Sequence, residues 1–414
     1  MTLEVHEKYS QELYTAKDRG YWKAIIALLF GSLLIFSTLY SFQPLLPVFV
    51  DQFNITPTLS SLVVSSSVFA MLMGLLILGF ISDRYGRNRI MILSIVVTVL
   101  TLLAMPFANS FALIVFLRLI QGFFLAGIPA AAMGFLGSEV APRSLGMAMS
   151  VYIASNALGG MGGRVTAGYL TDLFGWKTAF SVFAGFGLIA AILFIWLLPR
   201  ERFFKKSAQP VSHDLRGMAV HLKDRKLILY FCVGLILQIV FTAVWTYLPF
   251  YLQGEPFSIP LKWISLTYFA YLLGVIAPPI AGKLSAHYSL NSVMAAGIIF
   301  FFIGVWLTVI PAIAIIGLGL ALVCTGFFIA HSMASSSVTQ IATHHKSGAS
   351  SFYLISYYIG VVLGSTAAGV IWDVFSWIGI AATSLLLMPL VWMIFKSAHS
   401  SSIEKTNSII TNNN

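Results

Sequence analysis

Charged residues are scarce in this sequence. They make up 9% of its 414 residues, whereas an ordinary soluble domain carries about 25%. Hydrophobic residues reach 58%, and the mean hydropathy is +0.90. This composition argues against a soluble domain and predicts an integral membrane protein.

Cysteine is nearly absent, and the motifs of several enzyme classes are missing. Cys232 and Cys324 both lie in apolar runs, so we expect packing roles for them rather than a disulfide framework or a metal site. The sequence has no Walker-type nucleotide motif. It also places no Ser/His/Asp set, paired acids or His/Asp metal cluster at membrane depth. We therefore expect no enzyme activity, no cofactor and no metal.

Acidic residues are missing from the expected membrane interior, because all fourteen Asp and Glu residues map to loops or helix ends. Arg118 and Arg164, in contrast, fall inside apolar runs. A charge at mid-bilayer costs about 2.5–3.5 kcal/mol on insertion scales. Such a cost predicts that both arginines have a use.

Twelve apolar runs approach or exceed the length of about 20 residues that a helix needs to cross a bilayer. We expect an all-α membrane protein whose two six-helix bundles occupy 24–198 and 227–396. A cytoplasmic tail at 1–23, a cytoplasmic linker at 199–226 and a disordered cytoplasmic tail at 397–414 complete the chain. The runs lie near 24–50, 59–82, 90–107, 110–135, 144–170, 177–198, 227–252, 260–282, 290–309, 312–335, 348–371 and 376–396.

Positive charge is distributed unevenly between the two sides of these runs. With the N-terminus inside, 20 of the 24 Lys and Arg residues lie on the inner side and two, Lys177 and Lys262, on the outer side. Positive residues are retained in the cytoplasm, so both termini are predicted to be cytoplasmic. The same distribution explains the net charge of +10 without a nucleic-acid partner.

An internal repeat relates the two halves. Parallel repeats of this kind face each other across a central cavity, and its opening alternates between the two sides when one half rocks against the other. The repeat therefore predicts a carrier. At an offset of 201 residues, Tyr152, Asp172 and Trp176 recur as Tyr353, Asp373 and Trp377.

A charged turn at 79–89 separates the second and third runs, and its arginines place it at a membrane face. The turn resembles the loop signature of the major facilitator superfamily, G-x-x-x-D-R-x-G-R-[KR]-x, with Asn88 where a base is usual. The residues that match the signature are Gly79, Asp83, Arg84, Gly86, Arg87 and Arg89.

Two further motifs agree with this family. Residues 118–122 resemble its fourth-span signature R-x-x-Q-G, and residues 159–163 resemble the glycine-rich signature of antiporters, with Met161 in place of the usual proline. The stretches 159–164 and 330–332 resemble the acriflavine-sensitivity (YnfM-like) branch of the drug/proton antiporters. The resemblance implies the MFS fold of two pseudo-symmetric bundles.

The turn at 79–89 is expected to act as a gate on the inner side. Asp83 can accept hydrogen bonds from amides at the N-terminus of the eleventh helix when the halves close there, which would latch the outward-open state. Glu139 and Arg143 are expected either to join this cluster or to form a plain surface pair. The alternative for the whole motif is a solvated turn that only fixes topology.

Arg118 and Arg164 each have two interpretations. A buried guanidinium without a counter-ion suits an anionic substrate or group, because its fork matches a carboxylate or phosphate. Alternatively, each arginine donates to carbonyls that helix breaks at Pro44, Pro47 or Pro129 set free.

His331 is the one histidine well inside an apolar run, and its side chain titrates near neutral pH. It is either the proton-coupling group or a hydrogen-bonded packing residue. An apolar, aromatic wall with sparse polar groups is typical of a small-molecule site, although such residues also face lipid or other helices. The expected wall residues are Tyr40, Gln43, Gln121, Asn156, Gln238, Trp245, Tyr268, Tyr271 and Tyr357.

We therefore interpret the chain as a secondary active transporter of the cell membrane. We expect a monomer that exports small amphipathic organic compounds, driven by protons, by alternating access. The nearest alternative is an organic-anion or metabolite carrier that uses Arg118 and Arg164. An alternative of another class is a receptor or scaffold on a transporter fold, against which the intact loop signature argues.

Overall fold

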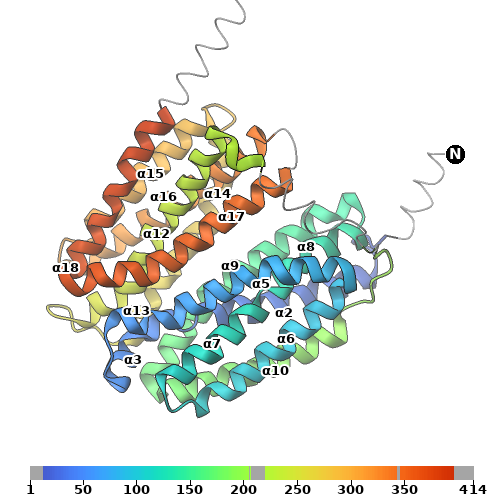
Figure 1. Ribbon diagram of the computed structural model, residues 1–414, viewed down its shortest axis with the longest axis horizontal. Coiled ribbons are helices and arrows are strands. Elements are labelled where there is room, and N and C mark those ends of the chain that lie inside the picture. Colours follow the sequence, from blue (N-terminus) through green and yellow to red (C-terminus); the bar gives the residue numbers. More distant parts are fainter. Residues whose placement is uncertain (1–12, 205, 207–219, 343–345, 396–414) are drawn as a thin grey trace, which may run out of the picture. The chain divides into compact units, whose positions relative to one another are not determined.

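The computed structural model describes residues 13–204, 206, 220–342 and 346–395, and all named elements in these ranges are helices (Figure 1). The predicted tail at 397–414 lies outside the described residues. So do residues 1–12 of the first tail and most of the predicted linker.

Ten helices in the described ranges are long and apolar enough to cross a membrane. Nine of them each cover one predicted run, and the tenth, Gly348–Phe395, covers the eleventh and twelfth runs, between which the backbone is kinked at Ser376 (φ 50°, ψ −143°). The remaining fifth run forms α9 (Pro142–Phe174), a helix of 33 residues that carries the glycine run and Arg164. All twelve predicted runs are therefore helical, as backbone in lipid must be.

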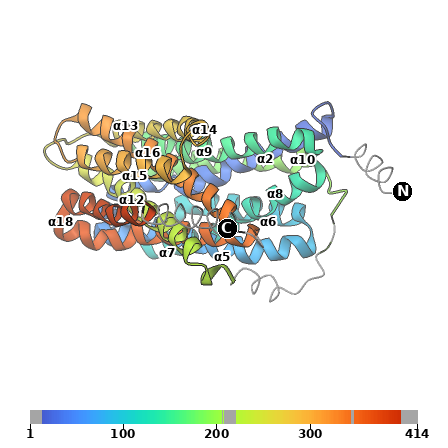
Figure 2. The same ribbon diagram turned by 90° about the horizontal axis from the view of Figure 1, so that it is seen from above.

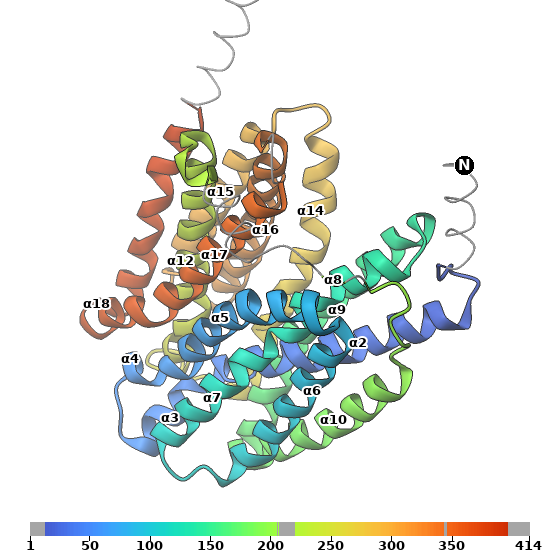
Figure 3. The same ribbon diagram turned by 45° about the vertical axis from the view of Figure 1, so that its right-hand side comes forward.

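The chain divides into two compact units, of which unit 1 contains Met1–Ile55, Leu62–Gln209 and Ile259–Tyr268. Within it, α9 packs against α2, α2 packs against α10, and α5 packs against α7 (Figure 3). Besides α9, its helices are α2 (Arg19–Tyr40), α3 (Leu46–Phe53), α5 (Leu62–Tyr85), α6 (Arg87–Ala104), α7 (Phe111–Leu125), α8 (Gly127–Glu139), α10 (Trp176–Leu197) and α13 (Leu261–Leu266).

Unit 2 contains Thr56–Ser61, Pro210–Ser258 and Phe269–Asn414. In its described part, α15 packs along α16 (Figure 2), and α12 packs against both α16 and α17 (Figure 1). Its helices are α4 (Pro57–Ser60), α12 (Arg225–Gln253), α14 (Leu273–Leu284), α15 (Leu290–Leu307), α16 (Ile313–Ile341), α17 (Lys346–Val362) and α18 (Ala368–Ala382).

Two glycines at equivalent repeat positions allow a close helix contact in each unit. A Cβ atom on Gly163 of α9 would lie 2.4 Å from the carbonyl oxygen of Ser37 on α2. A Cβ atom on Gly364, which follows α17, would lie 2.3 Å from the carbonyl oxygen of Ile239 on α12. Only glycine permits both approaches, because any side chain would collide with backbone.

Candidate functional site

Arg118 of α7 is fully buried and holds the end of α2, which stops before Pro44. Its Nη2 donates to the carbonyl of Leu39 at 2.8 Å and its Nη1 to the carbonyl of Thr38 at 3.2 Å. In a continuous helix these carbonyls would accept from amides four residues later. Arg118 Nε also donates to the carbonyl of Val63 at 2.9 Å, so the guanidinium joins three spans.

Gln121 extends the same set of contacts. Its side-chain oxygen accepts from Arg118 Nη1 at 2.6 Å, and its Nε2 donates to Thr101 Oγ1 at 3.0 Å. The guanidinium of Arg118 also lies 4.3 Å from the centre of the Phe42 ring. For Arg118, this geometry favours the role of holding helices together over contact with a substrate.

Arg164 of α9 lies in a different environment, although it is only 4% exposed. Its Nε donates to Gln43 Oε1 at 2.7 Å, and its Nη1 donates to the carbonyl of Gly160 at 2.9 Å. The guanidinium lies 3.8 Å from the ring centre of Tyr40 and 5.6 Å from that of Tyr268. We call Arg164, Gln43, Tyr40 and Tyr268 the Arg164 cluster.

The Arg164 cluster brings together residues that the sequence analysis placed in different halves. Tyr268 belongs to the predicted eighth span, yet it lies in unit 1 with α9. Its ring and that of Tyr40 offer aromatic faces to a cation. Asn156 lies two turns before Arg164 on α9 and is partly exposed.

His331 of α16 lies among aromatic residues in unit 2 and is partly exposed. Its Nδ1 is 2.8 Å from the hydroxyl of Tyr353, and its ring stacks on Phe327 with centres 5.7 Å apart. The ring of Tyr357 lies 5.0 Å away. We call these four residues the His331 cluster. The sequence analysis did not name Tyr353 as a site residue, although the repeat pairs it with Tyr152.

An aromatic group continues from the His331 cluster toward α12. Phe241 stacks on Phe327 with ring centres 3.9 Å apart, and Trp245 lies 4.9 Å from Tyr271. Trp245 is buried, whereas Tyr271 is partly exposed. Gln238 Nε2, one turn away on α12, donates to Thr242 Oγ1 at 3.0 Å. Trp245, Tyr271 and Tyr357 thus belong to one group of aromatic rings, and Gln238 lies on the same helix as Trp245.

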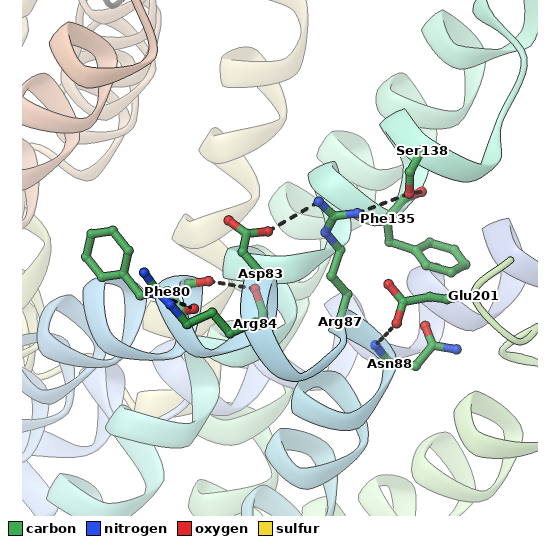
Figure 4. Close-up of polar contacts among 10 residues, drawn as sticks. Phe80, Asp83, Arg84, Arg87, Asn88, Phe135, Ser138 and Glu201 are labelled. Carbon is green, nitrogen blue, oxygen red and sulfur yellow. Dashed lines mark hydrogen bonds and ion pairs between the residues drawn. The ribbon is translucent and has the colours of Figure 1, made fainter. Parts of the chain in front are cut away.

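The turn at 79–89 has a defined geometry (Figure 4). Gly86 has φ +104°, which residues with a side chain rarely adopt, so it lets α5 end and α6 begin at once. Arg87 lies between Asp83 and Ser138: its Nη2 is 3.2 Å from Asp83 Oδ1, and its Nη1 donates to Ser138 Oγ at 3.1 Å. The side chain of Asp83 remains 53% exposed.

The other residues of the signature have local roles or face outward. Arg84 Nη1 donates to the carbonyl of Phe80 at 3.2 Å, one turn earlier on α5. Gly79 has open space where a Cβ atom would lie, and Arg89 is exposed. The predicted contact of Asp83 with the eleventh helix would join the two units and stays a prediction.

Glu139 does not form the surface pair with Arg143 that the sequence analysis considered. Glu139 is fully buried at the end of α8, whereas Arg143 is exposed. Glu139 instead accepts from the backbone amides of Arg202 and Phe203, both at 2.8 Å. Across the described ranges, no three His, Cys, Asp or Glu side chains gather closely enough to hold a metal ion.

The chain is similar to known membrane transporters. The family described as "Major Facilitator Superfamily" matches residues 28–328. The sequence is 34% identical over 359 residues to the uncharacterized MFS-type transporter YybF of Bacillus subtilis, which covers 86% of this chain and 89% of that protein. It is 32% identical over 379 residues to the inner membrane transport protein YnfM of Escherichia coli, covering 92% and 91% of the two chains.

Two more distant similarities are informative. The multi-drug resistance efflux pump PmrA of Streptococcus pneumoniae is 27% identical over 189 residues, which cover 45% of this chain and 46% of that one. Among solved structures, a mutant of the nucleoside transporter NupG matches with a TM-score of 0.77 at 14% identity, covering 90% of this chain and 99% of that one. This structural likeness shows a shared fold.

Proposed function

Since the chain belongs to the Major Facilitator Superfamily and is a multi-pass membrane transporter, we propose that it exports small amphipathic organic compounds in exchange for protons by alternating access. We also propose that it acts as a monomer in the cell membrane with both termini in the cytoplasm. The distribution of Lys and Arg supports this orientation.

The observation that carries the proposal is a titratable imidazole within an aromatic region. A neutral His331 can accept from the Tyr353 hydroxyl through Nδ1, whereas an imidazolium has only donors, so the Tyr353 oxygen must then accept. The charged ring would also interact with the neighbouring faces of Phe327 and Tyr357. Proton binding therefore changes the surface that a substrate meets in this unit.

The aromatic group around Phe241 suits an amphipathic substrate. Its partly exposed rings, such as those of Tyr271 and Tyr357, offer apolar stacking surface, and the partly exposed His331 can orient one end of a small molecule. The partial similarity to PmrA, which is a multi-drug resistance efflux pump, supports the same class of substrate.

Inverted membrane vesicles with an imposed pH gradient test this proposal. We expect gradient-driven uptake of ethidium, an amphipathic dye, by the wild-type protein. His331→Gln retains a polar side chain but does not titrate, so it is expected to abolish the dependence on the gradient. Tyr353→Phe removes only the hydroxyl and should shift the pH dependence without abolishing transport. Unchanged gradient dependence in His331→Gln would place proton coupling elsewhere.

A second candidate, an organic-anion carrier, is favoured by the Arg164 cluster. The guanidinium lies beside the rings of Tyr40 and Tyr268, and a carboxylate or sulfonate could pair with it there. Arg118 contributes less to this candidate, since it already binds the carbonyls that end α2. Comparing a cationic dye with an anionic one in the same vesicles separates the two candidates.

We further propose that the turn at 79–89 gates the inner side through Asp83. The observation that supports this role is that Arg87 holds the carboxylate on one side while about half of the Asp83 side chain stays exposed. An exposed and oriented carboxylate is available to helix amides. If Asp83→Asn transported at the wild-type rate, this gating role would be excluded.

A further inference from the structure

The first residues after α10 are attached to the end of unit 1 that carries the turn at 79–89. The carbonyl of Pro199 accepts from Asn88 Nδ2 at 2.7 Å, and Glu201 Oε2 accepts from the backbone amide of Asn88 at 3.1 Å. Figure 4 shows Glu201 beside Asn88 at the start of α6. We call residues 199–203 the strap.

The contact between Glu201 and Asn88 stabilises the start of α6. The amide of Asn88 lies in the first turn of this helix, where backbone donors have no partner within the helix. A carboxylate is also favourable at a helix N-terminus because of the helix dipole. The Asn88 side chain, which replaces the usual base of the signature, has an amide that can donate to the strap.

Glu139 provides the second attachment of the strap. Its Oε1 accepts from the amides of Arg202 and Phe203 at 2.8 Å each, and its Oε2 lies 3.4 Å from Arg202 Nε. Glu139 has no exposed surface. A carboxylate can be buried only when it is paired and hydrogen-bonded. The strap supplies these partners from a segment more than 60 positions away.

The segment before α2 meets the same residue. The amide of Tyr14 donates to the carbonyl of Glu139 at 2.8 Å, and the carbonyl of Tyr14 accepts from the amide of Ala141 at 2.9 Å. The Arg202 guanidinium lies 3.6 Å from the centre of the Tyr14 ring. Glu139 therefore joins the strap, the turn between α8 and α9, and the chain that enters α2.

The strap is also next to the signature turn. Asn88 follows Arg87, which contacts both Asp83 and Ser138. Ser138 in turn precedes Glu139. These contacts form a closed ring of polar groups across the ends of α5, α6 and α8, and the strap completes it.

We propose that Glu139 and Glu201 are positioning residues for transport. They fix the strap, and through it the turn at 79–89. The chain that leaves α10 is therefore held to unit 1 as far as Phe203, and not only as far as the end of the helix. Neither carboxylate contacts substrate. Loss of either anchor lets the strap and the turn move independently, which slows the conformational step without weakening substrate binding. This inference rests on transport by the family and not on proton coupling.

Amide hydrogen exchange of the full-length protein in lipid nanodiscs tests the attachment without any substrate. In Glu139→Gln we expect exchange at Arg202 and Phe203 to rise at least about tenfold, because a neutral amide oxygen accepts more weakly than the carboxylate and the new NH2 group faces the Arg202 guanidinium, which is also a donor. Exchange across 86–89 should rise with it. Glu201→Gln is the matched variant: it should weaken the hydrogen bond from the Asn88 amide, speed exchange there, and leave Arg202 and Phe203 close to wild type.

Two outcomes of this measurement would overturn the proposal. One is rapid exchange at Arg202 and Phe203 in the wild-type protein. The other is a strap that loosens in Glu139→Gln while exchange across 86–89 stays unchanged. If Glu139→Gln does not fold, Arg202→Ala replaces it, since it keeps both backbone hydrogen bonds to Glu139 and removes the guanidinium from the Tyr14 side chain.

In Arg202→Ala, the closed ring of polar groups predicts faster amide exchange at Tyr14.

Transport in vesicles tests the consequence. With ethidium as the probe, Glu139→Gln and Glu201→Gln should lower the maximum rate severalfold, leave the half-saturating concentration unchanged and keep the dependence on the pH gradient. A wild-type maximum rate in both variants, or a changed half-saturating concentration, would contradict the positioning role. Failure of the wild-type protein to carry ethidium would count against the proposed substrate class, while the exchange measurement would still decide the role of the strap.

Discussion

The carboxylate of Asp373 on α18 accepts a hydrogen bond from the hydroxyl of Thr58 on α4 at 2.5 Å. Its repeat equivalent, Asp172 on α9, lies 3.9 Å from Nζ of Lys262 on α13. Each contact lies within one unit, because α4 belongs to unit 2 and α13 belongs to unit 1. The two repeats thus use the same acidic position to hold a short segment that begins another span.

Glycines at equivalent positions make room for these segments. A Cβ atom on Gly369 would lie 2.6 Å from Thr58 Oγ1, and one on Gly168 would collide with the side chain of Ser265 on α13. The second and eighth spans each begin in one unit and continue in the other. The contacts at their first residues occupy equivalent positions, but one is a hydrogen bond and the other is an ion pair.

We predict that removing the Thr58 hydroxyl has a larger effect than removing the Lys262 charge. A hydrogen bond to a carboxylate contributes about 1.5–3 kcal/mol, and the exposure of Asp373 puts this one at the lower end of that range. A partly exposed ion pair at the separation of Lys262 and Asp172 contributes about 0–1 kcal/mol. Thr58→Val should therefore lower the midpoint of thermal unfolding in detergent more than Lys262→Met does. A larger effect of Lys262→Met, disappearing at high salt, would contradict this ranking.

The glycine run of α9 provides a prediction with an internal control. Gly163→Ala would place a Cβ atom against the backbone of Ser37. A Cβ atom added at the neighbouring Gly162 would instead lie in open space. We expect Gly163→Ala to destabilise the protein by about 1–3 kcal/mol through overpacking. Gly162→Ala should leave the thermal midpoint unchanged or raise it slightly, since alanine favours helix. Equal effects of the two substitutions would refute close packing of α9 on α2.

Arg118 is predicted to act through structure. Arg118→Met removes the donor to the carbonyl of Leu39, whereas the carbonyl of Thr38 keeps the hydroxyl of Ser41, and an unsatisfied buried acceptor costs about 1–3 kcal/mol. We expect a lower thermal midpoint and slower transport of cationic and anionic probes alike. Selective loss of anion transport, with the midpoint unchanged, would show that Arg118 contacts the substrate.

The helices could be predicted from sequence, but many of the partners could not. Long apolar runs predict spans because lipid leaves a continuous backbone no alternative to helix. One interpretation of Arg118 expected it to donate to carbonyls freed near Pro44, but the sequence does not show that these are the carbonyls of Thr38 and Leu39, or that Val63 adds a third. Glu139 was considered as one half of a surface pair, because its true partners are backbone amides in the linker, far along the chain.

Site residues that have an equivalent in the other repeat were easier to find than residues of a span that begins in one unit and continues in the other. His331 was identified because it is the one histidine well inside a run, and Tyr353 could have been added from its equivalence with Tyr152. Tyr268 was expected in the wall of the second half, yet it lies beside Arg164 in unit 1. The residues that begin the eighth span pack in unit 1 because of their tertiary contacts, and a hydropathy pattern carries no information about such contacts.

Arg164 provides the sharpest test between the two candidate substrates. Its guanidinium donates to Gln43 and stacks near Tyr40, and lysine cannot reproduce this geometry because an ammonium is a compact point charge. If anions bind here, Arg164→Lys should reduce anion uptake by about tenfold, since a charge-assisted bidentate pair contributes on the order of 1.5–3 kcal/mol. Ethidium transport should then change little.

If Arg164 only packs α9 against α2, transport of both probes should slow equally, and the thermal midpoint should fall as well. Measuring both probes and the midpoint on the same preparations of wild type, Arg164→Lys and Gln43→Ala decides between these outcomes, because Gln43→Ala frees Arg164 Nε while leaving the charge in place.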